Sequence, residues 1–497
     1  NKEEKYSMNF PILTLMIFTP FLGMILILLL KREQESAARF LAALFSFIPL
    51  VLSFILLARY DGSTASLQFV EKYEWIPSLG ITYYLGADGL SVPMLFLTAL
   101  LCFVSVIYSF GDIKERVKQY FAFLLLLEVG MMGVFAALDF FLFYVFWEIV
   151  LVPMYFLIGI WGHGRKEYSA IKFFLYTLFG SLFMLVGILA LYFTVEPHTL
   201  NMMVLIERAP ELARSFQLLA FVAFFIAFAV KVPIFPFHTW LPDAHVDAPT
   251  AVSVILAGVL LKMGTYGFLR ISYPMFPEGA IYFAIPIAIL ALINIVYGAL
   301  VCMAQKDLKK MIAYSSVSHM GYCMLGLAAI TVTGISGCMF QMVSHGLITG
   351  ALFILVGVLY ERSHTREIVA FGGLWTKLPV YSGIMILFVL GSLGLPGLSG
   401  FVSEFMVFVG AFPAFNVIVP LAIIGVVITA AYFLRMVQTM FLGTFNTKWE
   451  GLTEISGREL FTVIPLAILM IGIGVYPSPL ANMIKATIQN IVHLVTG

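Results

Sequence analysis

Apolar segments of about 20 residues recur along the whole chain, and no other feature restricts the fold as strongly. Hydrophobic residues fill 61% of the 497 positions, whereas charged residues fill 11%. A helix that crosses a bilayer needs about 20 apolar residues, and a barrel strand needs only about 9–11. Because every backbone polar group in lipid must find a partner inside the protein, the sequence predicts an all-α membrane protein without a separate soluble domain.

The hydropathy pattern predicts about fourteen transmembrane helices, and the apolar run of the first is longer than a signal-peptide core. The predicted spans are residues 10–30, 38–58, 88–110, 119–137, 139–161, 168–194, 214–240, 248–272, 280–303, 309–330, 334–361, 378–412, 416–443 and 459–477. The longest polar stretch, residues 59–87, is expected to be a single connection. Apolar residues at helical spacing in 481–495 predict a short helix that lies on the membrane surface or on a neighbour.

Lysine and arginine are concentrated in the loops after the odd-numbered spans. Since cytoplasmic loops carry the positive excess, these loops are expected to lie in the cytoplasm. Both termini are then expected on the opposite side of the membrane. We favour a prokaryotic cell membrane over an organelle membrane. A net charge of +1 without a basic tract gives no sign of nucleic-acid binding. The four cysteines show no metal-binding spacing, so we expect them to pack in the core: Cys102, Cys302, Cys323 and Cys338.

Two spans contain residues that interrupt a helix. The end of span 214–240 and the residues directly after it hold three prolines within ten positions, Pro233, Pro236 and Pro242. Residues 378–412 contain the run GSLGLPGLSG. Because proline removes a backbone donor and clashes with the preceding turn, helices 7 and 12 should both be broken. Such breaks at matching places in two halves are typical of transport sites.

The two breaks lie five spans apart, which suggests two five-helix repeats, helices 4–8 and 9–13. Because five is odd, the second repeat is expected to be inverted. The domain boundaries then follow: 1–118 for the first three helices, 119–272 for the first repeat, 280–443 for the inverted repeat, and 459–497 for the last helix and a short tail.

Four charged residues lie within long apolar runs: Glu148, Lys231, Lys262 and Glu404. A charge near the middle of a bilayer costs at least about 2.5–3.5 kcal/mol, and such residues usually mark an ion or proton pathway. A static ion pair is the alternative for Glu148 and Lys231, and a side chain that reaches the interface is the alternative for Lys262. Glu128 is a fifth buried acid, which either contacts a neighbouring subunit or pairs within the bundle.

Histidines and acids add further candidates. His319 and His345 fall on adjacent spans, where histidine can donate and accept a proton near neutral pH. His238 follows the break of helix 7 and either extends the path or caps freed carbonyl groups. Asp139 is expected to cap a helix. The loop with Asp243, His245 and Asp247 contains possible metal ligands, but a solvated loop is the favoured interpretation, and we expect no metal on this chain.

Long motifs carry a resemblance to a known family. They include FWEIVLVPMYFLIGIWG, KVPIFPFHTWLPDAHVDAPTAVSVILAGVLLKMG, QKDLKKMIAYSSVSHMGY, QMVSHGLITGALFILVGVLYERSHT and PGLSGFVSEFMVF. From span 3 to span 13 the chain resembles the antiporter-like family, which comprises the large proton-translocating membrane subunits of complex I and the related Mrp-type cation antiporters. Glu404 resembles the M-type members of complex I, since L-type members usually have lysine at this position.

The resemblance implies a path for protons through one module of a redox-driven pump. It implies a Glu148–Lys231 pair that acts as a switch, with Lys262 as the central lysine, His319 and His345 as relay positions, and Glu404 as the terminal acceptor. Side chains about 10 Å apart cannot exchange a proton directly, so internal water must bridge them. The alternatives are an Mrp-type sodium/proton antiporter subunit and a structural scaffold in which the charges are inert.

No nucleotide loop, flavin motif, haem motif or iron–sulfur cysteine set occurs in the sequence. The chain is therefore expected to act as a subunit of a translocating oxidoreductase, with no cofactor of its own. The resemblance implies partner subunits that hold flavin or deazaflavin and iron–sulfur clusters, and antiporter-like subunits on both sides within the lipid. NADH, reduced ferredoxin and reduced deazaflavin are the electron donors it leaves open, with quinone as the acceptor.

Overall fold

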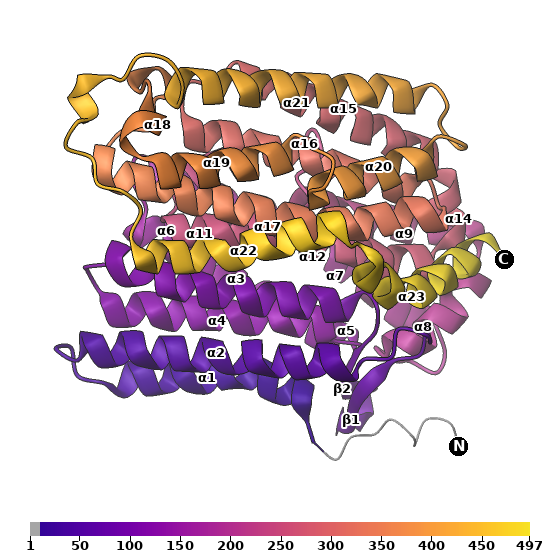
Figure 1. Ribbon diagram of the computed structural model, residues 1–497. Coiled ribbons are helices and arrows are strands. Elements are labelled where there is room, and N and C mark those ends of the chain that lie inside the picture. Colours follow the sequence, from indigo (N-terminus) through magenta and orange to yellow (C-terminus); the bar gives the residue numbers. More distant parts are fainter. Residues whose placement is uncertain (1–9) are drawn as a thin grey trace.

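The computed structural model describes residues 10–497, and it is a bundle of long helices that lie roughly side by side (Figure 1). Residues 1–9, which belong to the first predicted domain, lie outside the described part. Twelve helices in residues 10–497 are long and apolar enough to cross a membrane: Ile12–Leu29 (α1), Glu35–Arg59 (α2), Ser91–Asp112 (α3), Val117–Ala136 (α4), Phe140–Trp161 (α5 and α6), Lys166–Thr194 (α7), Arg214–Lys231 (α9), Thr250–Met275 (α11 to α13), Ala284–Met303 (α15), Val332–Ser363 (α17), Ile418–Met440 (α21) and Gly457–Val475 (α22). The predicted class, a helical membrane bundle, is confirmed.

Three further apolar helices occupy the remaining predicted spans: Leu308–Ala328 (α16), Pro379–Ser392 (α19) and Ser399–Ala411 (α20). Short helices connect the long ones: Met202–Arg208 (α8), Trp240–Asp247 (α10), Pro277–Tyr282 (α14) and Leu374–Lys377 (α18). The total of fourteen spans and the inverted repeats remain predictions, as do the domain boundaries. The two predicted breaks are present, after Lys231 and between Ser392 and Ser399.

Side chains at the predicted helix starts satisfy free backbone N–H groups. Asp139 accepts a hydrogen bond from the Phe141 N–H at 2.9 Å, which confirms its expected role as a cap. Asp307 and Thr331 start α16 and α17 in the same way. Ser456 and Glu459 form a reciprocal capping box at the start of α22. The caps place the helix ends at defined positions in the chain.

The expected single connection at residues 59–87 contains a β-hairpin that the sequence did not predict. Strands Gln68–Ile76 (β1) and Ile81–Ala87 (β2) pair antiparallel, with Glu74 opposite Thr82. The hairpin packs on the start of α1, where the Glu71 carboxylate accepts from the Leu13 N–H at 2.8 Å. The sequence prediction missed the hairpin because aromatic and charged residues alternate in it without a membrane-length apolar run.

The last helix, Ser478–Thr496 (α23), confirms the expected amphipathic tail. Its apolar face, which includes Ile484 and Ile488, is buried against α13, α14 and α17 of the same chain. Figure 1 shows α23 and the C-terminus at the end of the bundle that also carries the hairpin, whereas α18 lies at the opposite end.

Two helices hold the centre of the bundle. The apolar windows of Thr250–Met275 and Val332–Ser363 are completely buried, whereas fewer than half of the residues in those of α1, α7 and α21 are buried. Figure 1 shows α12 and α17 between an edge formed by α1 and α2 and an edge formed by α15 and α21. The enclosed helices are those that carry Lys262 and His345.

Candidate functional site

The break of helix 7 begins at Lys231 and is held open by an asparagine of α15. The Asn294 side chain accepts from the Phe235 N–H at 2.8 Å and donates to the Pro233 carbonyl at 3.1 Å. Its amide also donates to the Val317 carbonyl at 3.3 Å. Because unpaired backbone groups are costly inside a bilayer, Asn294 stabilises the irregular backbone at the break by pairing these groups.

Lys231 is the last residue of α9 and is 1% exposed. Its Nζ atom lies 5.1 Å from the centre of the Trp147 ring and 5.9 Å from that of Phe173, and it has no hydrogen-bond partner among residues 10–497. Glu148 follows Trp147 on α5, near enough for its charge to act on Lys231, but no ion pair within 4 Å joins the two in the described structure. The pair that the resemblance implied is therefore separated here, with the ammonium group over an aromatic face.

Lys262 lies just after a transition from a π-helical to an α-helical turn. Residues Leu256–Leu260 form a π-helical turn, and the Lys262 Nζ atom donates to the Ala257 carbonyl of this turn at 2.5 Å. Single π-helical turns are frequent at functional sites. The side chain is fully buried, so it does not reach the membrane interface.

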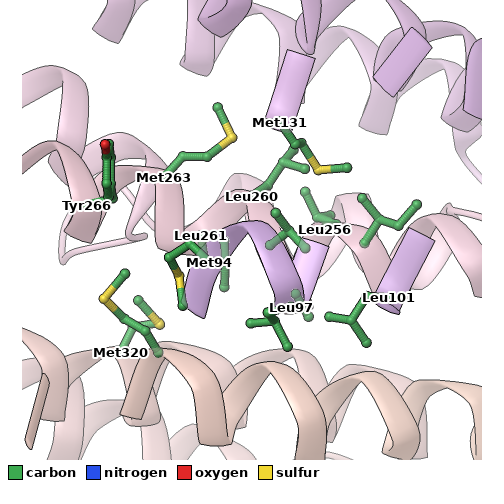
Figure 2. Packing of buried hydrophobic residues seen from close by; sticks show 14 of the residues in the cluster. Met94, Leu97, Leu101, Met131, Leu256, Leu260, Leu261, Met263, Tyr266 and Met320 are labelled. Atoms are coloured by element: carbon green, nitrogen blue, oxygen red, sulfur yellow. The ribbon is translucent and has the colours of Figure 1, made fainter. Parts of the chain in front are cut away.

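Apolar side chains surround the helix that carries Lys262. Figure 2 shows Leu256 and Leu260 packed among residues of neighbouring helices, including Met94, Leu97 and Met131. A close-packed apolar wall has few voids that can hold water. On this side, Lys262 is therefore shielded from water.

The polar partner of Lys262 is a histidine of α17. The Lys262 Nζ atom donates to His345 Nδ1 at 2.6 Å, and the rings of His345 and His319 are 5.7 Å apart between centroids. The Nε2 atom of His345 has no hydrogen-bond partner within the described part of the chain. The three predicted residues are thus adjacent, with one ring nitrogen free to exchange a proton through water.

The second break brings Glu404 to the same cluster. The Glu404 Oε1 atom lies 3.5 Å from His319 Nδ1, and His319 Nε2 lies 3.0 Å from the Ser392 hydroxyl at the break. Gly394 has a φ of +79°, and a Cβ atom there would lie 2.9 Å from Glu404 Oε2. Glycine at this position therefore provides both the left-handed backbone and the space for the carboxylate.

A small cavity joins these groups. It has a volume of ≈ 10 Å³ and is lined by His319, His345 and Glu404, together with Gln341. This volume is room for about one water molecule. The Ser403 hydroxyl donates to Oε1 of the Gln341 side chain, and this bond holds the side-chain amide beside His319. Lys262, His345, His319 and Glu404 consequently form one polar line inside the bundle.

Two predicted candidates lie apart from this line. Glu128 on α4 is completely buried, so it does not reach a neighbouring subunit, and neither of its carboxylate oxygens has a hydrogen-bond partner among residues 10–497. Among residues 10–497, the His238 side chain caps no carbonyl group. Its Nε2 atom lies 3.2 Å from the Tyr297 hydroxyl, and its ring stacks on Phe235.

The expected solvated loop with Asp243, His245 and Asp247 is wrong, because these residues form α10. His245 is fully buried and stacks on Phe353 with 4.6 Å between ring centroids. Asp247 accepts from the Ser169 hydroxyl at 2.5 Å, and Asp243 pairs with Lys172 at 2.7 Å. The helix follows directly on the break, so its polar residues turn inward, which the local sequence did not reveal.

His245 is buried near Lys262 and near Lys309, a residue that lines a polar cavity. The charges of Lys262 and Lys309 both act on His245, whose ring nitrogens have no hydrogen-bond partner in the described chain. Lys309 lines a cavity of ≈ 340 Å³ together with Asp112 and His163. Burial and the nearby Lys309 charge lower the pKa of His163, which lies in the connection between α6 and α7. Ala248, the residue directly after α10, also lines this cavity.

Sequence reasoning missed four residues of the site, namely Asn294, Gln341, Ser392 and Ser403, and it placed His245 in a solvated loop. The available signal for Asn294 and Gln341 was a polar residue inside an apolar span. Both were overlooked because their side-chain amides carry no charge. Serine is frequent in membrane helices, so Ser392 and Ser403 gave no signal of their own.

Comparisons with known proteins agree with this architecture. Residues 137–429 match the family model described as NADH:quinone oxidoreductase/Mrp antiporter, TM. The chain is 40% identical over 490 residues to NADH-quinone oxidoreductase subunit M of Rickettsia conorii. The aligned region covers 97% of this chain and 99% of that protein. It is 41% identical over 480 residues to NADH-ubiquinone oxidoreductase chain 4 of Arabidopsis thaliana, covering 96% of each chain.

Solved structures give the same result. A chain of respiratory complex I from Thermus thermophilus superposes with a TM-score of 0.90 at 30% identity, over 98% of this chain and 100% of that chain. A chain of the Mrp complex from Dietzia sp. shares the fold, with a TM-score of 0.80 at 20% identity, over 98% of both chains. The resemblance seen in the motifs, including its M-type character, is confirmed. The protein is a multi-pass membrane protein that belongs to the NADH:quinone oxidoreductase/Mrp antiporter transmembrane family.

Proposed function

We propose that this chain is a proton-translocating membrane-arm subunit of a complex I-type redox pump in a prokaryotic cell membrane. The observation that carries the proposal is the polar line Lys262–His345–His319–Glu404, with contacts of 2.6 Å at one end and 3.5 Å at the other. Its members come from four different helices inside an otherwise apolar bundle. Fixed, desolvated titratable groups joined by a water-sized cavity are suited to proton transfer.

The proton enters from the polar cavity at Lys309 and passes His245 on its way to Lys262. His345 and His319 then carry it toward Glu404, which releases it on the other side. Lys231 and Glu148 act as the switch: a carboxylate that approaches an ammonium group favours the charged form of both, and its withdrawal favours proton release. The position of the Lys231 ammonium group over the Trp147 ring, without an ion pair to Glu148, supports a switch in which withdrawal of the carboxylate allows release.

The driving reaction takes place on partner subunits. The names of the relatives favour NADH as electron donor and quinone as acceptor. Flavin or deazaflavin and iron–sulfur clusters would be bound by those partners, and no redox centre would lie on this chain. Antiporter-like subunits are proposed to flank it in the membrane, where a movement of the neighbour changes the distance between Glu148 and Lys231.

The test replaces His345 with leucine in the assembled complex. Because leucine cannot carry a proton between Lys262 and His319, the rate of proton translocation through this subunit in proteoliposomes should fall by about 10²-fold or more. His493→Leu is the matched control, since His493 is exposed on α23 and should leave translocation unchanged. An assembled His345→Leu complex that pumps normally would favour a scaffold role, and sodium-dependent proton movement without a redox partner would favour an Mrp-type antiporter.

A further inference from the structure

A second site lies at the end of the bundle that carries the α1–α2 connection, and it shares no lining residue with the cavity of the polar line. A cavity of ≈ 550 Å³ opens where the α1–α2 connection meets the start of α4 and the end of α6. Its polar rim carries Arg32, Arg116, Lys118 and one acid, Glu35. The volume is within the range of roughly 300–1,000 Å³ that is typical of ligand sites.

The two arginines of the rim are free to bind an anion. Within residues 10–497, neither Arg32 nor Arg116 forms an ion pair. The Lys118 ammonium group donates to the Leu28 and Leu30 carbonyls at the end of α1, so it is held at the rim. Glu35 already faces Arg39 on its own helix at 3.6 Å. The rim therefore has a positive excess without an internal partner.

The start of α4 adds to this potential. Arg116 immediately precedes α4, and its side chain does not cap the helix. The first N–H groups of a helix and its dipole both favour an anion at this position. Because Val117 and Gln119 line the same cavity, the helix start and the arginines act on one volume.

The opposite wall of the cavity is apolar. Phe123 of α4 and Phe156 of α6 stack with 5.2 Å between ring centroids and an interplanar angle of 16°. Val152, Phe156 and Ile160 recur every four residues, so they share one face of α6, and Val152 and Phe156 are 48% and 38% exposed. This face leads from the charged rim toward the middle of the membrane.

We propose that this cavity binds an anionic phospholipid. The phosphodiester group would lie between Arg32, Arg116 and the first turn of α4, with an acyl chain along the exposed face of α6. Basic pockets beside apolar helix faces have this combination of charge and shape, and they favour anionic over zwitterionic lipids. A soluble anion would use the rim but not the apolar face.

Native mass spectrometry of the assembled complex tests the proposal. The delipidated complex is exposed to vesicles of phosphatidylglycerol or of phosphatidylcholine, and retained lipid is counted. The native complex should retain phosphatidylglycerol preferentially. Arg32→Gln combined with Arg116→Gln should weaken retention by roughly 30-fold, since each basic residue near an anionic lipid contributes about a factor of five.

Two variants serve as controls. Lys377→Gln removes an exposed cation at the same end of the bundle but outside the cavity, so retention should be unchanged. Arg32→Lys combined with Arg116→Lys keeps the charge and should keep the lipid, even where the glutamine variant fails to assemble. Equal retention of both lipids by the native complex, displacement of the lipid by inorganic phosphate alone, or an acidic segment of another subunit cross-linked in the cavity would each overturn the proposal.

Discussion

At the scale of single residues, the two glycines of the second break give a matched pair. Gly394 and Gly397 have φ angles of +79° and +93°, so alanine at either position adds backbone strain of about 1–2 kcal/mol. A Cβ atom at Gly394 would also lie 2.9 Å from the Glu404 carboxylate, whereas one at Gly397 meets no atom within 4 Å. Glu404 must shift in the first variant alone.

We therefore expect Gly394→Ala and Gly397→Ala to lower the stability by similar amounts, because the flexible carboxylate can move aside. Only Gly394→Ala should slow proton translocation, by roughly tenfold or more, as a misplaced reacting group can cost about 10²-fold. Thermal unfolding and proteoliposome pumping measure the two effects. Equal pumping by both variants would contradict a role for the position of Glu404.

Asn294 makes a different kind of contribution, since it carries no charge and bonds only to backbone groups. Asn294→Leu leaves the Phe235 N–H and the Pro233 carbonyl unpaired inside the membrane, so we expect a loss of stability of roughly 2–6 kcal/mol, at about 1–3 kcal/mol for each unpaired group. Asn482→Leu, at an exposed position of α23, is the control. An unchanged stability of the Asn294 variant would show that the backbone groups at the break find other hydrogen-bond partners.

At the scale of elements, the contact between α9 and α12 fixes the distance between the two buried lysines. Gly264 permits this contact: a Cβ atom there would lie 2.6 Å from Val232 Cγ2 and 3.1 Å from Lys231 Cβ. Gly264→Ala should push the helices apart and lower both stability, by about 1–3 kcal/mol, and proton translocation. Gly159→Ala on α6, where the nearest atom is 3.6 Å away, should change neither in the same assays.

The elements also show where sequence reasoning succeeds. The breaks after Lys231 and Ser392 were predicted because proline and glycine act on their own helix. The hairpin at 68–87 and helix α10 were missed because their stability depends on neighbours, such as the bond from the Leu13 N–H to Glu71. Local chemistry determines where a helix stops, and the surrounding structure determines what the chain does next.

At the scale of the whole molecule, the loops rich in lysine and arginine should face the cytoplasm. All four native cysteines are buried, at 1% exposure or less, so a single introduced cysteine reports on its own position. In intact cells a membrane-impermeant maleimide should label Lys485→Cys on α23, and it should label Lys377→Cys only after permeabilisation. The reverse pattern would invert the predicted orientation and the direction of the proton path.

The sequence by itself determined the class of the molecule, the helical bundle, the two breaks and the buried charges. These features follow from the free-energy cost of bringing backbone groups and charges into lipid. Because this cost applies to each segment separately, the local sequence is enough to predict its effect. The tertiary structure decided which groups meet. Lys262 and His345 are 83 positions apart in the chain, and Glu404 reaches His319 only across the second break. Such contacts depend on the rotation and depth of whole helices, which packing among all of them fixes together.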